Sequence, residues 1–216
     1  MHLKIEDILA QESMYRRHFM NTLPGPRGVH LVGTKGHRGA ENIGVFSSFV
    51  HISASSPPLL GFIMRPLTVP RDTYHNIKAN KWFTINTLHP DFLDQAHQTS
   101  ANYPNGESEF VATGLTPEYS EDCKAPYVAE SRIRIGLTFE EEHKISGIET
   151  FFIVGRVREI FLPDEAVAAT GHRLVREKDF PHPTNYETAL DAADSVSHTH
   201  PTLPTTRLRK SFVSFR

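Results

Sequence analysis

Two groups of hydroxyl and cationic side chains lie close together in the first half of the chain. The first is the pair Ser47-Ser48, which separates two apolar runs, and the second is Arg71-Asp72-Thr73, where a helix is predicted to begin. The free N–H groups of a helix start, together with an arginine and a hydroxyl, form a natural site for an anion such as a phosphate. The serine pair can donate hydrogen bonds to the edge of a flat polar ring. The two groups could therefore hold the two ends of one ligand.

Two further side chains extend this candidate site. Phe49 directly follows the serine pair and could supply apolar contact to a ring. Arg65 ends a predicted strand that points toward the same end of the fold. Each motif taken alone is more often an ordinary bend or an ordinary helix cap. Their order and spacing in one segment favour the functional interpretation.

The elements that must position these residues are mainly strands. Alternating or β-branched apolar runs predict strands at 29–32, 41–45, 49–53, 59–64, 82–88, 133–140 and 151–161. Helices are predicted within 5–20, at 73–80 with Asp72 as N-cap, and at 90–101. Strands and helices do not alternate regularly, which argues against a doubly wound parallel sheet. A mainly β (α+β) fold, a small antiparallel barrel with helices packed outside, fits better.

The chain of 216 residues predicts one domain with extensions. We place the domain at residues 1–175, including the N-terminal helices. From Arg176 onward the chain is rich in Pro, His, Thr and Asp and poor in large apolar residues. We therefore expect residues 176–216 to form a C-terminal extension, an extended or partly disordered arm.

Composition argues against several classes of partner. With 23 basic and 25 acidic residues, no charge excess favours nucleic acid. No apolar run approaches the roughly 20 residues of a membrane helix, and the N-terminus lacks a signal-peptide pattern. The single Cys123 excludes an internal disulfide and suits a reducing cytoplasm. His198-Thr199-His200 has no evident third ligand, so we predict no metal site.

A series of segments carries a family resemblance. They run in the order Val32-Gly33-Thr34, Asn42 to Phe49, Ser56 to Leu59, Arg71 to Ile77, Phe83 to Asn86, Ala129 to Ser131 and Phe152 to Val157. This series resembles the flavin reductase-like FMN-binding family, and its flavoredoxin-type branch in particular. The resemblance covers roughly residues 29–161, and the segments around Ser47-Ser48 and Arg71-Asp72-Thr73 are its most specific parts.

The resemblance implies a split β-barrel, a Greek-key antiparallel barrel with peripheral helices, that forms a homodimer with FMN near the subunit interface. It gives Asp72 and Asn76 a supporting or capping role. It implies ring contacts from Asn42, Ser47, Ser48 and Phe49, and phosphate contacts from Arg71 and Thr73 with Arg65 close by.

The function that follows is an FMN-binding oxidoreductase that passes electrons from NAD(P)H through FMN to flavin or another small acceptor. Many flavin reductases of this family carry a histidine in the stretch that corresponds to 148–152, where it helps to engage the nicotinamide, and this chain has none there. One alternative is a non-catalytic FMN electron carrier with a protein partner, and another is a small-molecule-binding barrel without flavin. The flavin does the redox chemistry, so we assign no catalytic residue.

Overall fold

The computed structural model describes residues 2–25, 28–37, 39–101, 103 and 107–163. The predicted extension at 176–216 lies outside these residues. In chain order the described elements are α1 (Ile5–Leu9), α2 (Ser13–Thr22), β1 (His30–Lys35), β2 (Glu41–Phe46), β3 (Phe49–Ser53), β4 (Leu59–Met64), α3 (Asp72–Asn80), β5 (Trp82–Thr87), η1 (Pro90–Phe92), α4 (Leu93–Gln98), α5 (Glu109–Thr113), β6 (Pro117–Glu118), β7 (Tyr127–Val128), β8 (Arg134–Ile145) and β9 (Thr150–Phe161).

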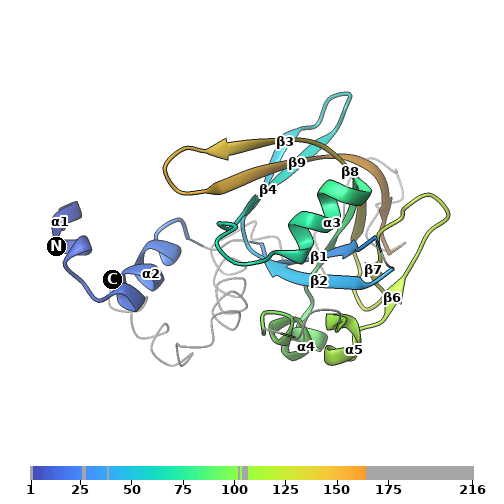
Figure 1. Ribbon diagram of the computed structural model, residues 1–216, viewed down its shortest axis with the longest axis horizontal. Helices are drawn as coiled ribbons and strands as arrows, with labels where there is room; N and C mark the ends of the chain where they lie inside the picture. The colour runs from blue at the N-terminus through green and yellow to red at the C-terminus, as the bar shows by residue number, and fades with distance from the viewer. Residues whose placement is uncertain (1, 26–27, 38, 102, 104–106, 164–216) are drawn as a thin grey trace.

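Seven strands form one antiparallel sheet in the order β2-β1-β5-β8-β9-β4-β3. The two edge strands, β2 and β3, are consecutive in the chain and are joined by only Ser47 and Ser48. So short a link requires the sheet to curl until its edges nearly meet (Figure 1). The edges do not pair, so the barrel is split. The predicted antiparallel split barrel is therefore confirmed.

Ser48 bridges the point where the chain crosses from one edge to the other. Its hydroxyl accepts a hydrogen bond from the Ile63 N–H at 3.1 Å and donates to the Ile63 carbonyl at 3.2 Å. The next residue, Phe49, then pairs with Phe62 in the regular ladder between β3 and β4. The side chain of Ser48 thus replaces one rung of backbone pairing on β4.

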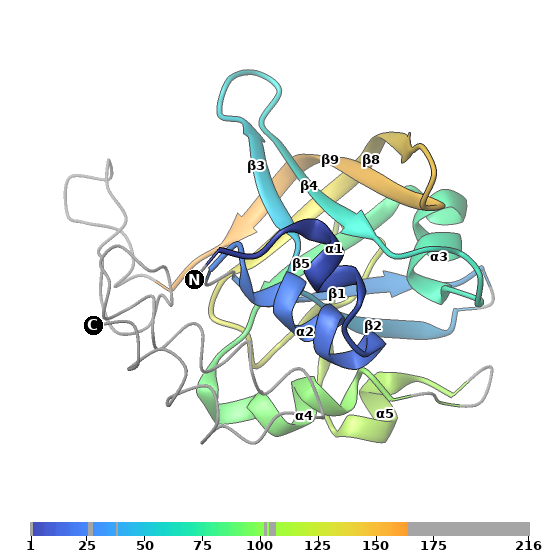
Figure 2. The same cartoon turned by 90° about the vertical axis from the view of Figure 1, so that its left-hand side faces the viewer.

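Two apolar clusters lie on the two faces of β1 and β2. The first packs between these strands and the helices α4 and α5, and includes Leu31, Ile43 and Phe110. The second fills the barrel interior and includes Val32, Phe62 and Phe83, with Ile77 of α3 closing it. Figures 1 and 2 show α3 lying over one opening of the barrel, with α4 and α5 beside β2.

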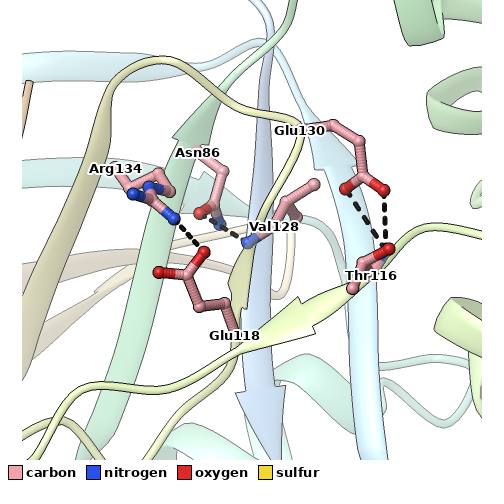
Figure 3. A network of polar contacts seen from close by, with 6 residues as sticks. All are labelled: Asn86, Thr116, Glu118, Val128, Glu130 and Arg134. Atoms are coloured by element: carbon pink, nitrogen blue, oxygen red, sulfur yellow. Dashed lines mark hydrogen bonds and ion pairs between the residues drawn. The ribbon is translucent and has the colours of Figure 1, made fainter. Parts of the chain in front are cut away.

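The short strands β6 and β7 were not predicted, and polar contacts hold them against the barrel (Figure 3). The Asn86 side chain accepts a hydrogen bond from the Val128 N–H at 3.0 Å. Arg134 on β8 pairs with Glu118 on β6. The carboxylate of Glu130 accepts from the Thr116 N–H at 3.0 Å. The buried bond of Asn86 and the ion pair of Arg134 therefore tie β6 and β7 to the barrel strands β5 and β8.

The other predicted elements match the structure, with shifts at their ends. The predicted helix at 90–101 is η1 followed by α4, and ends at Gln98, where the hydroxyls of Thr99 and Ser100 donate to nearby helix carbonyls. Strand β8 continues to Ile145, beyond its predicted end. No described helix is long and apolar enough to cross a membrane.

Candidate functional site

One face of β2 forms the floor of the candidate site. Successive side chains of a strand point to opposite faces, so Asn42, Gly44 and Phe46 share one side. This side faces α3 and the barrel interior, where Phe46 packs against Phe62 with ring centroids 5.0 Å apart. Ile43 lies on the opposite side, in the cluster with α4 and α5. The sequence segment that looked like one motif is therefore divided between two faces.

A buried polar network joins this floor to the start of α3. The Asn42 side-chain amide donates to the Thr73 hydroxyl at 3.0 Å and to the Thr34 hydroxyl at 3.1 Å. Asn76, one turn further along α3, also donates to Thr34 at 3.1 Å. Asn42, Thr34 and Thr73 are all buried. Because unpaired polar groups in such a place are costly, this network fixes the position of the first turn of α3 on β1 and β2.

Helix α3 begins one residue earlier than predicted. Arg71 is its N-cap, with extended backbone angles (φ −130°, ψ 93°) and no side-chain hydrogen bond to the first turn. The prediction that Asp72 caps the helix is wrong, because Asp72 is already the first residue of the helix. Asp72 is exposed to solvent. The first-turn N–H groups therefore have no side-chain cap from Arg71.

Two features of this helix start fit a phosphate group. The Nε atom of Arg71 is buried and has no hydrogen-bond partner among the described residues. A Cβ on Gly44 would lie 3.5 Å from the Thr73 hydroxyl and 3.3 Å from the Phe46 ring, so residue 44 places no side chain against that hydroxyl. An uncapped helix start, an unpaired guanidinium nitrogen and a hydroxyl beside a glycine suit an oxyanion.

The serine pair lies at the other end of the same strand. Ser47 follows Phe46 directly, and both serines are half-buried. The Ser48 hydroxyl is engaged by β4, which leaves the Ser47 hydroxyl as the better-placed donor of the two. The Phe49 ring packs against Phe62 at 5.2 Å and against His30 at 4.7 Å, so the protein itself holds this ring.

The structure brings most of the predicted site residues together around β2. Asn42 touches Thr73, and Gly44 adjoins it, three residues before Ser47. Arg65 is exposed and follows the last residue of β4, and the segment 66–70 links it to Arg71. The serine bend follows the last residue of β2 and the helix start contacts the same strand through Asn42, so both adjoin β2.

The opposite side of α3 is held by the hairpin of β8 and β9. Lys78 pairs with Glu142 at 2.9 Å, and the Tyr74 ring lies 5.5 Å from the Phe151 ring. Burial, followed by the charge of Glu142, raises the pKa of Tyr74 above its ordinary value. The Lys78 ammonium also lies 4.9 Å from the centre of the Phe139 ring. The helix is therefore fixed from two directions.

Comparisons with known proteins agree with this architecture. The family model of the flavin reductase like domain matches residues 22–178. The chain belongs to this family. A candidate flavin reductase with a split barrel domain from Shewanella frigidimarina is 42% identical, with a TM-score of 0.75 over 79% of this chain and 84% of that chain. The flavoredoxin of Desulfovibrio vulgaris is 26% identical, with a TM-score of 0.59 over 69% of this chain and 77% of that chain.

A protein relative extends the comparison beyond solved structures. An uncharacterized protein of Halalkalibacterium halodurans is 30% identical over 165 residues, which are 74% of this chain and 78% of that protein. The predicted family is thus confirmed, and the family supports flavin binding and a flavin reductase-type function.

Three residues that shape the site were not predicted from the sequence. Thr34 and Gly44 lie inside the motifs that carry the resemblance, and strand periodicity would have placed Gly44 on the face of Asn42. Glu109 on α5 gave no signal, because its partner is far away in the chain. Its carboxylate accepts a hydrogen bond from the Ile43 N–H at 3.3 Å and covers the outer edge of β2.

Glu109 generates a pH-dependent contribution to stability. Burial raises the pKa of its carboxyl, and the charge of Asp72 adds to the increase, although the hydrogen bond from Ile43 lowers it. A raised pKa in the folded state favours folding below the ordinary pKa of glutamate, and this contribution is lost as the pH rises through the folded-state value. Glu109→Gln stays neutral at every pH. As the pH rises from the ordinary pKa of glutamate through the folded-state value, we therefore expect its free energy of unfolding to increase relative to that of the parent.

Urea unfolding at a series of pH values measures this difference. Glu121→Gln, at an exposed position, is the matched control for removing one carboxylate from the surface. If the free energies of unfolding of Glu109→Gln and the parent ran parallel across the whole range, Glu109 would not titrate as its burial requires.

Proposed function

We propose that this chain is an FMN-binding oxidoreductase that accepts electrons from NAD(P)H and passes them to free flavin or another small acceptor. The proposal rests on family membership and on one observation in particular. The floor of β2 and the start of α3 meet through the 3.0 Å hydrogen bond between Asn42 and Thr73. The two proposed subsites, the helix start for a phosphate and the serine bend for a ring edge, therefore both adjoin β2.

The phosphate is assigned to the start of α3. Arg71 would supply a charged donor, Thr73 a hydroxyl, and the first turn its free N–H groups, while Gly44 places no side chain against the Thr73 hydroxyl. Arg65, exposed after the end of β4, would add positive charge nearby. Asp72 is exposed at this end and, as a carboxylate, is a supporting residue rather than a direct phosphate ligand in this proposal.

The ring edge is assigned to the bend between β2 and β3. Ser47 and Ser48 would offer backbone N–H groups there, with the hydroxyl of Ser47 in addition, and Phe49 would provide apolar support from the barrel side. Such donors stabilise the negative charge that develops at the N1/O2 edge when a flavin is reduced. Bound FMN would supply hydride-accepting and electron-transferring chemistry that no amino-acid side chain provides.

A second candidate function is a non-catalytic FMN carrier that exchanges electrons with a protein partner. The stretch 148–152 contains no histidine that could engage a nicotinamide, which favours the carrier. Phe151 and Phe152, near the beginning of β9, lie in that stretch instead. His143 of β8 lies opposite Phe152 in the ladder, so an imidazole is nevertheless present on this hairpin. The donor therefore has to be identified by experiment.

Anaerobic mixing with NADH or NADPH separates these two functions. We expect the purified protein to show the yellow absorption of bound flavin, and either donor to bleach that band rapidly. Persistent colour with both donors, but bleaching by dithionite, would instead support the carrier. A colourless protein that takes up no added FMN would contradict both and leave a barrel that binds another small molecule.

Replacing Arg71 tests the phosphate assignment. We expect Arg71→Ala to weaken FMN binding by about 1–3 kcal/mol, the range for loss of a charged hydrogen-bond partner. Fluorescence titration measures the affinity, and Arg158→Ala, at an exposed position on β9, is the matched control that should leave it unchanged. Equal FMN affinity in the two variants would remove Arg71 from the site.

We extend the proposal to a homodimer with FMN near the subunit interface. Helix α2 buries no residue within its own chain, and isolated helices of its length are marginal in water. Large apolar side chains are exposed along the N-terminal segment, at Leu3, Ile5, Leu9, Tyr15, Met20 and Leu23. Figure 1 shows α1 and α2 standing off from the barrel, where a second copy could cover them.

Sedimentation velocity tests the dimer. We expect the double substitution Leu9→Glu and Tyr15→Glu to shift the protein from dimer toward monomer, because a charge would replace apolar contact on both helices. Val111→Glu changes an even more exposed apolar residue, on α5, and should leave the dimer intact. A parent protein that sediments as a monomer at all concentrations would refute this part of the proposal.

A further inference from the structure

The amide nitrogen of the Asn42 side chain is fully committed within the protein. Its amide nitrogen carries two hydrogens, and the two acceptors it reaches are the hydroxyls of Thr34 and Thr73, at 3.1 and 3.0 Å. Asn42 is buried, with an exposed fraction of 8%. A direct contact between this amide nitrogen and a flavin ring would break one of these two bonds. A ring contact of Asn42 through this nitrogen therefore conflicts with its hydrogen bonding, and only the carbonyl oxygen of the side chain is left for one.

Thr34 anchors the amide in this orientation. The Thr34 hydroxyl is inaccessible to solvent and accepts from Asn42 and from Asn76, so both of its lone pairs are used. The carbonyl oxygen of the Asn42 side chain then faces away from both threonine hydroxyls. Thr73 consequently receives a hydrogen bond from Asn42 and does not donate one to it.

The proton of the Thr73 hydroxyl is left for another acceptor. No described residue accepts it within hydrogen-bonding distance, although the threonine residue is as buried as Asn42. The hydroxyl adjoins Gly44 at the start of α3, in the helix turn that follows Arg71, whose Nε is buried and unpaired. A donor held in this direction suits an oxyanion, which only accepts hydrogen bonds.

We propose that Asn42 is a positioning residue that orients the Thr73 hydroxyl as a donor to the ligand's phosphate, so that the site distinguishes FMN from riboflavin. The inference rests on the proposed function, because the phosphate belongs to FMN. It changes the role of Asn42 from a ring contact to a residue that acts through Thr73. The preference for FMN over riboflavin then comes from the fixed direction of the Thr73 hydroxyl proton as well as from positive charge.

Reversing the hydrogen bond at Asn42 tests the inference. In Asn42→Asp the volume is conserved, but an ionised carboxylate only accepts, so the Thr73 proton would turn toward residue 42 and away from the phosphate. We expect the affinity for FMN to fall by about tenfold or more, the scale of one charged hydrogen bond, with riboflavin affinity nearly unchanged. Flavin fluorescence titration measures both affinities.

A double-mutant cycle separates orientation from simple charge repulsion. Thr73→Val removes the hydroxyl, and in that background Asn42→Asp should cost much less FMN affinity than it does alone. If the loss were the same in both backgrounds, the carboxylate would act by its charge and the inference would fail. Thr73→Ser keeps a hydroxyl and should retain most of the preference for FMN.

Further outcomes keep the two proposals distinct. If Asn42→Asp does not fold, as judged by circular dichroism, Asn42→Ala takes its place. It should lower FMN affinity by a smaller factor, because a freed Thr73 hydroxyl can still turn to the phosphate. A parent protein that binds neither flavin overturns the proposed function and this inference with it. A parent that prefers FMN, with Asn42 variants that weaken FMN and riboflavin equally, overturns the inference alone and restores a ring contact for Asn42.

Discussion

The link of two residues between the edge strands β2 and β3 is the constraint on which the rest of this structure depends. The strands lie at opposite edges of a seven-stranded sheet, yet the chain passes from one to the other through Ser47 and Ser48 alone. Only a strongly curled sheet allows this, and the hydroxyl of Ser48 supports the crossing by bonding both backbone groups of Ile63. The bend is thus a structural element of the barrel before it is part of any binding site.

The second requirement is that α3 close the curled sheet at a defined height and angle. Apolar packing of Ile77 alone would tolerate sliding, because hydrophobic contact has no direction. Hydrogen bonds are directional, and the buried links among Thr34, Asn42 and Thr73 are satisfied in one arrangement. The pair of Lys78 with Glu142 holds the opposite face of the helix. The same polar groups that orient the helix therefore orient the donors at its start.

Much of this fold could be predicted from the sequence, because its strands carry a strong local signal. The predicted limits of β3 and β4 coincide with the observed ones, and the strand predicted at 133–140 corresponds to the first part of β8. The short elements α5, β6 and β7 were missed. They have too few residues for a periodic signal, and they are held by partners distant in the sequence, such as Asn86 for Val128. The cap of α3 was misplaced by one residue for a related reason, since the Asn42–Thr73 contact and the extended angles of Arg71 decide where the helix starts.

The sequence by itself determined the residue types of the candidate site, the family, and the succession of strands that brings the serine bend before the helix start. Local patterns and motif order carry that information. Tertiary structure decided which of those residues are committed to the protein and which remain available to a ligand. The hydroxyl of Ser48 and the amide of Asn42 are taken up by distant backbone and side-chain partners, whereas Arg71 Nε and the proton of Thr73 have no partner among the described residues. Hydrogen-bonding capacity is finite, and how it is shared depends on neighbours that only the folded chain brings within reach.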